Sequence, residues 1–191
     1  LALFPLFGIL SPDDVALAYG NKLVLLMLGG FMLSAAMEKS GVHERIALGM
    51  VHLFGSGSGR RLVFGFMTAS AVLSMWISNA ATTLMLLPIA MAVVSQTTNR
   101  KLQVSLLLGI AYGASVGGVA TPIGTPPNLV FMGIYKEATG TDIEFFDWMK
   151  MAAPVVFIML PIVGFWLTRG IRSIEPITLP SVGAWRKEEY R

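Results

Sequence analysis

The sequence lacks cysteine altogether and has few charged residues. Of its 191 residues 13% are charged, whereas a soluble globular domain carries about 25%. Without cysteine the chain has no disulfides, no thiolate metal ligands and no cysteine nucleophile. The scarcity of charge argues against a soluble enzyme, a disordered chain and a nucleic-acid-binding protein. The net charge of +3 does not change this, because basic cytoplasmic loops are ordinary in membrane proteins.

What the sequence has instead is long uncharged stretches. Asp, Glu, Lys and Arg are absent from residues 23–37, 46–59, 62–99, 102–135 and 151–168. An apolar run of about 18 residues or more is typical of a membrane span. The sequence therefore predicts an all-α membrane protein with transmembrane helices. Because the chain starts at Leu1 within apolar sequence, we interpret it as a piece of a longer membrane protein.

The basic residues predict the topology. Most of the fourteen Lys and Arg residues lie in 39–61, 100–101 and 169–191, whereas 13–22 and 136–150 are rich in acids. Basic residues in short loops favour the cytoplasmic side of the membrane. We therefore expect the first three segments to be cytoplasmic and the other two to lie outside.

This topology places both ends of 62–99 on the cytoplasmic side. Two full spans of about 20 residues each would leave almost no residues for a turn. The most polar part of the run, 78–83, lies at its midpoint. We predict a re-entrant helical hairpin whose polar tip lies inside the membrane. Two short spans joined by a small external loop are the alternative.

The run 102–135 must cross the membrane, and it contains three prolines and a glycine within 121–128. Each proline removes a backbone donor from a continuous helix. We predict a discontinuous helix that breaks near 121–127, leaves carbonyl oxygens unpaired and restarts near Asn128. A proline kink without a function is the alternative.

The rest of the chain is predicted from its apolar pattern. Spans are expected at 23–38 and 148–168. An amphipathic helix on the cytoplasmic surface is expected at 39–54. Residues 170–191 read as a cytoplasmic tail or linker.

The two interrupted segments contain no Asp, Glu, Lys, Arg or His and offer neutral oxygens instead. The side chains concerned are Ser74, Ser78, Asn79, Thr82, Thr83, Thr121, Thr125 and Asn128. Neutral oxygens suit a hard monovalent cation, and the N-termini of half-helices favour an anion. Ser74 and Ser78 have a spacing that predicts one shared helix face. For Thr82 and Thr83, a bond back to the carbonyl four residues earlier is an equally good explanation. Because no catalytic motif is present, we do not expect an enzyme.

Two motifs resemble the N-terminal-half signatures of the divalent anion:sodium symporters, a family of dicarboxylate, citrate and sulfate transporters. They are Leu-Ser74-Met-Trp-Ile-Ser78-Asn79-Ala-Ala-Thr-Thr and Ala120-Thr-Pro-Ile-Gly-Thr-Pro-Pro-Asn128. The resemblance extends over about 20–170. It implies scaffold-domain helices at 1–55 and half of a transport domain at 60–169. It also implies one half of an inverted repeat, a homodimer and an elevator mechanism.

The resemblance also implies site residues. A Na⁺ ion as coupling ion would be held by Ser74, Ser78, Asn79 and, through its backbone, Gly124. A substrate site would be formed by Asn79, Ala80, Thr125 and Pro126. The family tip reads Ser-Asn-Thr, so the hydroxyl of the third position is missing at Ala80.

The function expected from the sequence is Na⁺-coupled symport of small divalent anions, with C4-dicarboxylates such as succinate first. Ala80 makes a Na⁺/sulfate symporter a close alternative. A Na⁺-independent dicarboxylate exchanger and a non-transporting membrane subunit are the others. The expected location is a lipid bilayer, specifically the bacterial inner (plasma) membrane, and no nucleic-acid partner is expected.

Overall fold

The computed structural model describes residues 3–42, 45–46, 49 and 58–171. All regular secondary structure within this part of the chain is helical, which confirms the all-α prediction. The helices are α1 (Pro12–Tyr19), α2 (Lys22–Ser40), α4 (Gly59–Ser74), α5 (Asn79–Val94), α6 (Arg100–Gly117), the 3₁₀ helix η1 (Gly118–Ala120), α7 (Pro126–Thr139) and α8 (Phe145–Thr168).

Within the described residues, three helical segments are long and apolar enough to cross a membrane. They are α2, α6 together with η1, and α8, with 19, 21 and 24 residues. At 1.5 Å per residue they measure about 29–36 Å, close to the thickness of a bilayer core. The spans expected at 23–38 and 148–168 coincide with α2 and α8. Most of the surface helix expected at 39–54, and the tail from residue 172 on, lie outside the described residues.

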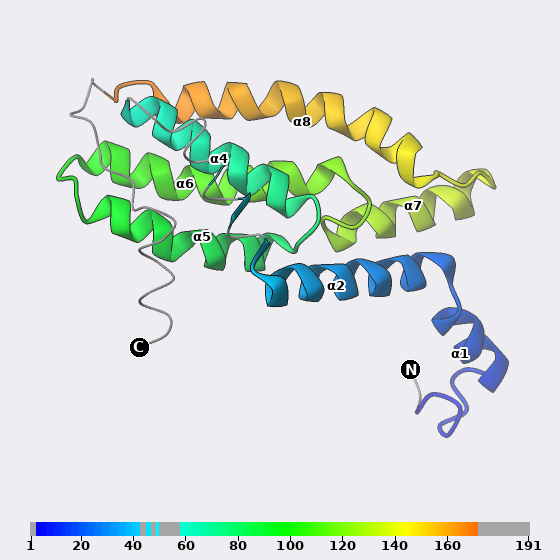
Figure 1. The fold of residues 1–191 in the computed structure, drawn as a ribbon. Coiled ribbons are helices and arrows are strands. Elements are labelled where there is room, and N and C mark those ends of the chain that lie inside the picture. Colours follow the sequence, from blue (N-terminus) through cyan, green and yellow to red (C-terminus); the bar gives the residue numbers. More distant parts are fainter. Residues whose placement is uncertain (1–2, 43–44, 47–48, 50–57, 172–191) are drawn as a thin grey trace, which may run out of the picture.

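Helices α4 and α5 form an antiparallel pair joined by residues 75–78, and both pack against α6. The start of α4, the end of α5, the start of α6 and the end of α8 lie together at the left of Figure 1. The contact between α4 and α6 is close because α6 carries small residues. A Cβ atom built on Gly113 would lie 2.5 Å from the carbonyl oxygen of Met67. The glycines of α6 therefore serve helix packing, as the small-residue pattern indicates.

The turn between α4 and α5 differs from the prediction in its position. The sequence placed the polar tip at 78–83, but 79–83 form the first turns of α5. The reason is that Ser78 is the N-cap of α5 and accepts a 3.2 Å hydrogen bond from the backbone nitrogen of Ala81. Serine is among the strongest N-cap residues. Because α4 ends at Ser74, the expectation that Ser74 and Ser78 share one helix face was wrong.

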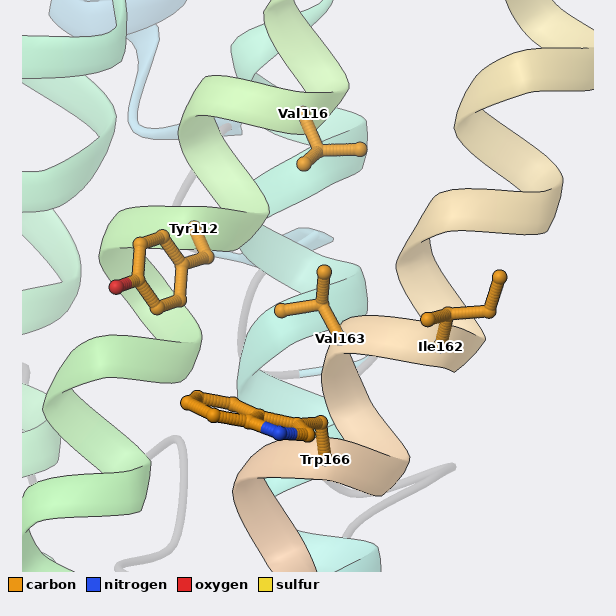
Figure 2. A pocket seen from close by; sticks show the side chains of 5 residues that line it. All are labelled: Tyr112, Val116, Ile162, Val163 and Trp166. Atoms are coloured by element: carbon orange, nitrogen blue, oxygen red, sulfur yellow. The ribbon is translucent and has the colours of Figure 1, made fainter.

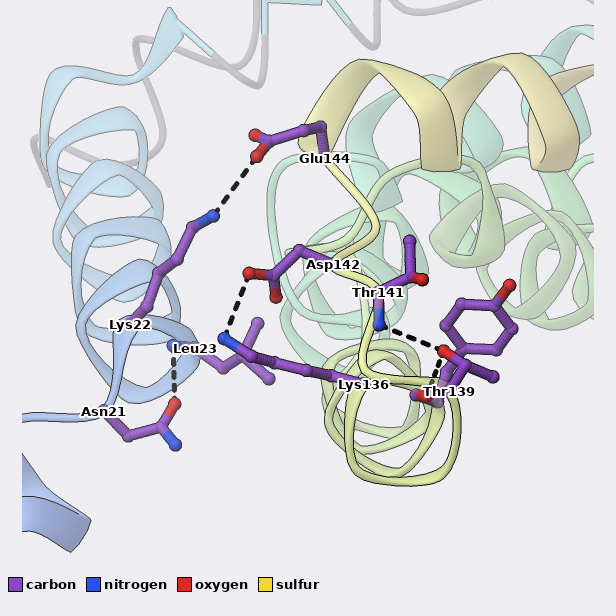
Figure 3. Close-up of polar contacts among 9 residues, drawn as sticks. Asn21, Lys22, Leu23, Lys136, Thr139, Thr141, Asp142 and Glu144 are labelled. Atoms are coloured by element: carbon purple, nitrogen blue, oxygen red, sulfur yellow. Dashed lines mark hydrogen bonds and ion pairs between the residues drawn. The ribbon is translucent and has the colours of Figure 1, made fainter.

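Helix α2 packs along α7, and ion pairs mark the end of the molecule at which α2 begins. Figure 3 shows Lys22 paired with Glu144 at 3.4 Å and Lys136 paired with Asp142 at 3.0 Å. The side chains of Lys22 and Glu144 are 61% and 67% exposed. Exposed pairs of this kind contribute little free energy. No residue of α2 is fully buried, and its apolar contact is made by the partly buried Leu23, Leu26 and Met27, which pack against Leu129, Met132 and Trp148.

Candidate functional site

The candidate site lies where the α6–α7 segment is interrupted. Helix α6 ends at Gly117, η1 continues to Ala120, and α7 restarts at Pro126. Pro126 and Pro127 occupy the first two positions of α7, where a backbone donor has no partner within the helix. The break predicted near 121–127 is therefore observed, with the restart two residues earlier than expected.

Asn128 joins the two sides of the break. Its buried side-chain nitrogen donates to the carbonyl oxygens of Gly118 at 2.9 Å and Thr121 at 2.8 Å. Gly118 is the residue whose carbonyl a donor at position 122 would have bonded in a continuous helix. The prediction that this oxygen is left unpaired was wrong, because a side chain replaces the missing backbone donor.

Thr121 connects the break to the turn between α4 and α5. Its hydroxyl donates to the carbonyl oxygen of Met75 at 2.5 Å and accepts from the backbone nitrogen of Gly124 at 3.1 Å. Thr121 is fully buried. The turn 75–78 and the break therefore form one connected unit in the middle of the helical bundle (Figure 1).

Ser74 and Asn79 face each other across the same turn. The hydroxyl of Ser74 donates to the side-chain oxygen Oδ1 of Asn79. A Cβ atom on Gly118 would lie 2.5 Å from Asn79 Oδ1, and one on Gly124 would lie 2.8 Å from the carbonyl oxygen of Ser74. Only glycine permits these approaches without a shift of its neighbours. Oxygens of Ser74 and Asn79 thus meet the backbone of Gly118 and Gly124.

The structure brings together three of the four residues expected to hold Na⁺, namely Ser74, Asn79 and Gly124. Ser78, the fourth, is exposed, and its hydroxyl accepts the capping bond from Ala81. That hydroxyl is therefore partly committed to helix capping.

The residues expected to face the substrate lie at two helix starts. Asn79 and Ala80 open α5, and Pro126 opens α7 after the N-cap residue Thr125. Ala80 and Pro126 are exposed, whereas Asn79 and Thr125 are half-buried. Both starts carry the partial positive charge of a helix N-terminus, which favours an anion. Pro126 and Pro127 have no backbone N–H group, so N–H donors for an anion come from the start of α5.

Sequence reasoning missed Gly118 and the pairing of Thr121 and Asn128. In the sequence, Gly109, Gly113, Gly117 and Gly118 form a stripe of small residues, which by itself favours helix packing for all four. A signal was available, because the four-residue spacing of the α6 glycines ends at Gly117, which leaves Gly118 out of register. The partners of Thr121 and Asn128 lie up to 46 residues away in the sequence, and no local pattern indicates them.

A hollow of about 270 Å³ lies between α6 and α8, apart from these polar groups. Figure 2 shows that it is lined by Tyr112, Val116, Ile162, Val163 and Trp166. All five side chains are apolar or aromatic, so the hollow suits neither a cation nor a small anion.

The comparisons with known proteins agree with the motifs at the break. The model of a family described as citrate transporter matches residues 1–188. The chain is 37% identical over 178 residues to the sodium-dependent dicarboxylate transporter SdcS of *Staphylococcus aureus* strains USA300, NCTC 8325 / PS 47 and COL. Each alignment covers 87% of this chain and 34% of the relative, so the chain spans about a third of the relatives' length. The chain therefore belongs to the citrate transporter family, and its resemblance to the divalent anion:sodium symporters is confirmed.

Proposed function

We propose that the full-length protein is a Na⁺-coupled symporter of small divalent anions, with C4-dicarboxylates such as succinate as its first substrates. The observation that carries this proposal is the meeting of Ser74, Asn79, Gly118 and Gly124 at two helix interruptions. The curated relatives are named for sodium-dependent dicarboxylate transport. Na⁺ is accordingly the coupling ion.

In the proposed site, Ser74, Ser78, Asn79 and the backbone of Gly124 hold the Na⁺ ion. Neutral oxygens can replace the hydration shell of Na⁺, and carbonyl groups at interrupted helices supply them in other transporters. The substrate binds at Asn79, Ala80, Thr125 and Pro126, at the starts of α5 and α7. A bound cation next to a carboxylate, about 4 Å away, contributes a few kcal/mol at intermediate dielectric. The substrate thus binds better after Na⁺, which couples the two without a charged side chain.

The transport step we propose is an elevator motion in a homodimer. Helices within 1–55 would form the scaffold, and 60–169 would form half of the moving domain. In this arrangement α4 and α5 would form a re-entrant hairpin, with their outer ends on the side of the α6 start (Figure 1). A second, inverted half would supply a matching hairpin. The proposed location is the bacterial inner membrane.

Sulfate is the second candidate substrate because of Ala80. The family's threonine at this position carries a hydroxyl, and this chain lacks it at an exposed place beside the anion-binding helix start. A tetrahedral inorganic dianion needs fewer directed contacts than a carboxylate pair held at a fixed spacing. The Na⁺/sulfate alternative thus differs from the first proposal only in the substrate, and both use the same Na⁺ site.

Uptake of labelled succinate into proteoliposomes containing the full-length protein tests the proposal. We expect uptake that requires an inward Na⁺ gradient and persists in excess sulfate. If sulfate abolishes succinate uptake, we would assign an inorganic anion as the substrate. Succinate exchange without Na⁺ would contradict the symport mechanism.

A further inference from the structure

The hydroxyl of Thr82 lacks a hydrogen-bond partner within the described part of the chain. Thr82 lies in the first turns of α5 and is 0% exposed. Its Oγ1 atom is buried and unpaired. Buried hydroxyls in folded proteins nearly always have a partner, so an unpaired one indicates a group that binds there.

Other helical threonines show that this is not the usual behaviour of threonine in a helix. In the described residues their hydroxyls donate to the carbonyl oxygen four residues earlier, the common local bond. The pairs are Thr68–Phe64, Thr83–Asn79, Thr139–Tyr135 and Thr168–Gly164. The local explanation that the sequence allowed for both neighbours therefore holds for Thr83 and fails for Thr82.

Thr82 belongs to the same face of α5 as Asn79. Residues three apart in a helix are neighbours on its surface, and Asn79 contacts Ser74 and the backbone of Gly118. Ser74 and Thr82 are both 0% exposed, whereas Ser78 and Ala80 are exposed. The fully buried oxygens are thus on the inner side of the helix start, where a small dehydrated cation fits better than a dicarboxylate.

We propose that Thr82 Oγ1 is a further ligand of the Na⁺ ion in the proposed site. This inference rests on the proposed function and adds one oxygen to it. The added oxygen of Thr82 is buried, whereas Ser78 is exposed. The hydroxyl of Ser78 already accepts the hydrogen bond that caps α5. A threonine oxygen has two lone pairs besides its O–H donor. No described residue donates to the lone pairs of Thr82 Oγ1, so they are open to a cation.

The test is Na⁺-dependent thermal stabilisation of the full-length protein in detergent, with choline chloride keeping the ionic strength constant. Thr82→Val keeps the shape of the side chain and removes the hydroxyl, and Thr82→Ser keeps the hydroxyl. Thr68→Val is the matched control, because the hydroxyl of Thr68 donates a hydrogen bond to the carbonyl oxygen of Phe64. A ligand that binds only the folded state stabilises it by RT ln(1 + c/Kd) at free ligand concentration c, so the Na⁺ concentration needed for a given shift of the unfolding midpoint rises with Kd.

We expect Thr82→Val to need about tenfold more Na⁺ for the same shift, which corresponds to about 1.4 kcal/mol. Thr82→Ser and Thr68→Val should remain within about twofold of the unsubstituted protein. If Thr82→Val does not fold, Thr82→Ala removes the same hydroxyl and gives the same comparison.

If the Na⁺ concentration needed for the stabilisation is unchanged in Thr82→Val, the inference is wrong. A higher unfolding midpoint of Thr82→Val in the absence of Na⁺ would strengthen this conclusion. A changed succinate KM with an unchanged Na⁺ response would also overturn it, since the hydroxyl would then contact the substrate. If the unsubstituted protein shows no Na⁺ shift, the proposed function itself fails. The two failures are therefore distinguishable.

Discussion

The side-chain nitrogen of Asn128 donates a 2.9 Å hydrogen bond to the carbonyl oxygen of Gly118, ten residues earlier in the chain. This bond replaces the backbone bond that Pro122 cannot make, and a second bond joins Asn128 to the carbonyl oxygen of Thr121. The break is consequently a defined structure held by the side chains of Asn128 and Thr121. Its geometry depends on an amide donor at position 128.

Asn128→Asp tests this dependence. The substitution keeps the shape but replaces the donor with an oxygen that faces two carbonyl oxygens. Leaving these groups unpaired should lower the free energy of unfolding by about 2 kcal/mol or more. Chemical or thermal unfolding of the purified full-length protein measures the loss.

Asn21→Asp is the control for Asn128→Asp. Asn21 caps α2 by accepting a 2.8 Å bond from the backbone nitrogen of Leu23, and aspartate accepts such a bond equally well. The free energy of unfolding of the Asn21→Asp variant should therefore equal that of the unsubstituted protein. Equal stability of both variants would contradict the role assigned to Asn128.

Gly118→Ala should impair Na⁺ binding. The new methyl group would lie 2.5 Å from Asn79 Oδ1, so Asn79 must move away from Ser74. We expect the Na⁺ concentration for half-maximal uptake to rise by about tenfold or more, as the loss of about 1.4 kcal/mol implies. Gly29→Ala on α2 is the control, because a Cβ atom there meets no other atom within 4 Å.

Asn79→Ala should abolish Na⁺-dependent uptake while leaving the protein folded. Asn79 is half-buried and provides the oxygen on which the Ser74 and Gly118 contacts converge. Uptake in proteoliposomes and the elution profile of the purified variant together check this outcome. Full activity in Asn79→Ala would rule out the site as assigned.

Ala80→Thr should improve the selectivity for dicarboxylates over sulfate. The exposed first turn of α5 has room for the hydroxyl, which could then donate to a substrate carboxylate. One added hydrogen bond to a charged group contributes about 1.5–3 kcal/mol, or at least about tenfold in affinity. Competition between labelled succinate and sulfate measures the ratio.

Ala138→Thr is the control for this substitution, because Ala138 is equally exposed but lies near the end of α7. An unchanged selectivity in Ala80→Thr would mean that the substrate meets the protein elsewhere.

Much of the helical arrangement could be predicted from the positions of charges and prolines. The long apolar helices α2 and α8 followed from uncharged runs, and the break followed from three prolines. The exact turn did not follow, because the capping strength of Ser78 outweighed the polar character of 79–83. Residues 79–83 were predicted to form the tip of the hairpin because they are polar, but they are helical.

The site could be predicted less completely than the fold. Ser74, Asn79 and Gly124 were found through motifs, and the structure brings them together. Gly118 was not assigned to it, and Thr82 was named among the candidate oxygens with a local hydrogen bond as an equally good explanation. Their importance depends on distances between helices and on which hydroxyls remain unpaired, and neither is encoded in local spacing.

The absence of Asp, Glu, Lys, Arg and His from 62–99 and 102–135 has a further consequence. Protons cannot compete for this half of the site by titrating its residues, so its own charge stays the same from acidic to neutral medium. Acidification would act on the cargo instead, by converting a dianion into a monoanion before it is bound. The dependence of transport on proton concentration would then report the ionisation of the solute rather than that of the carrier.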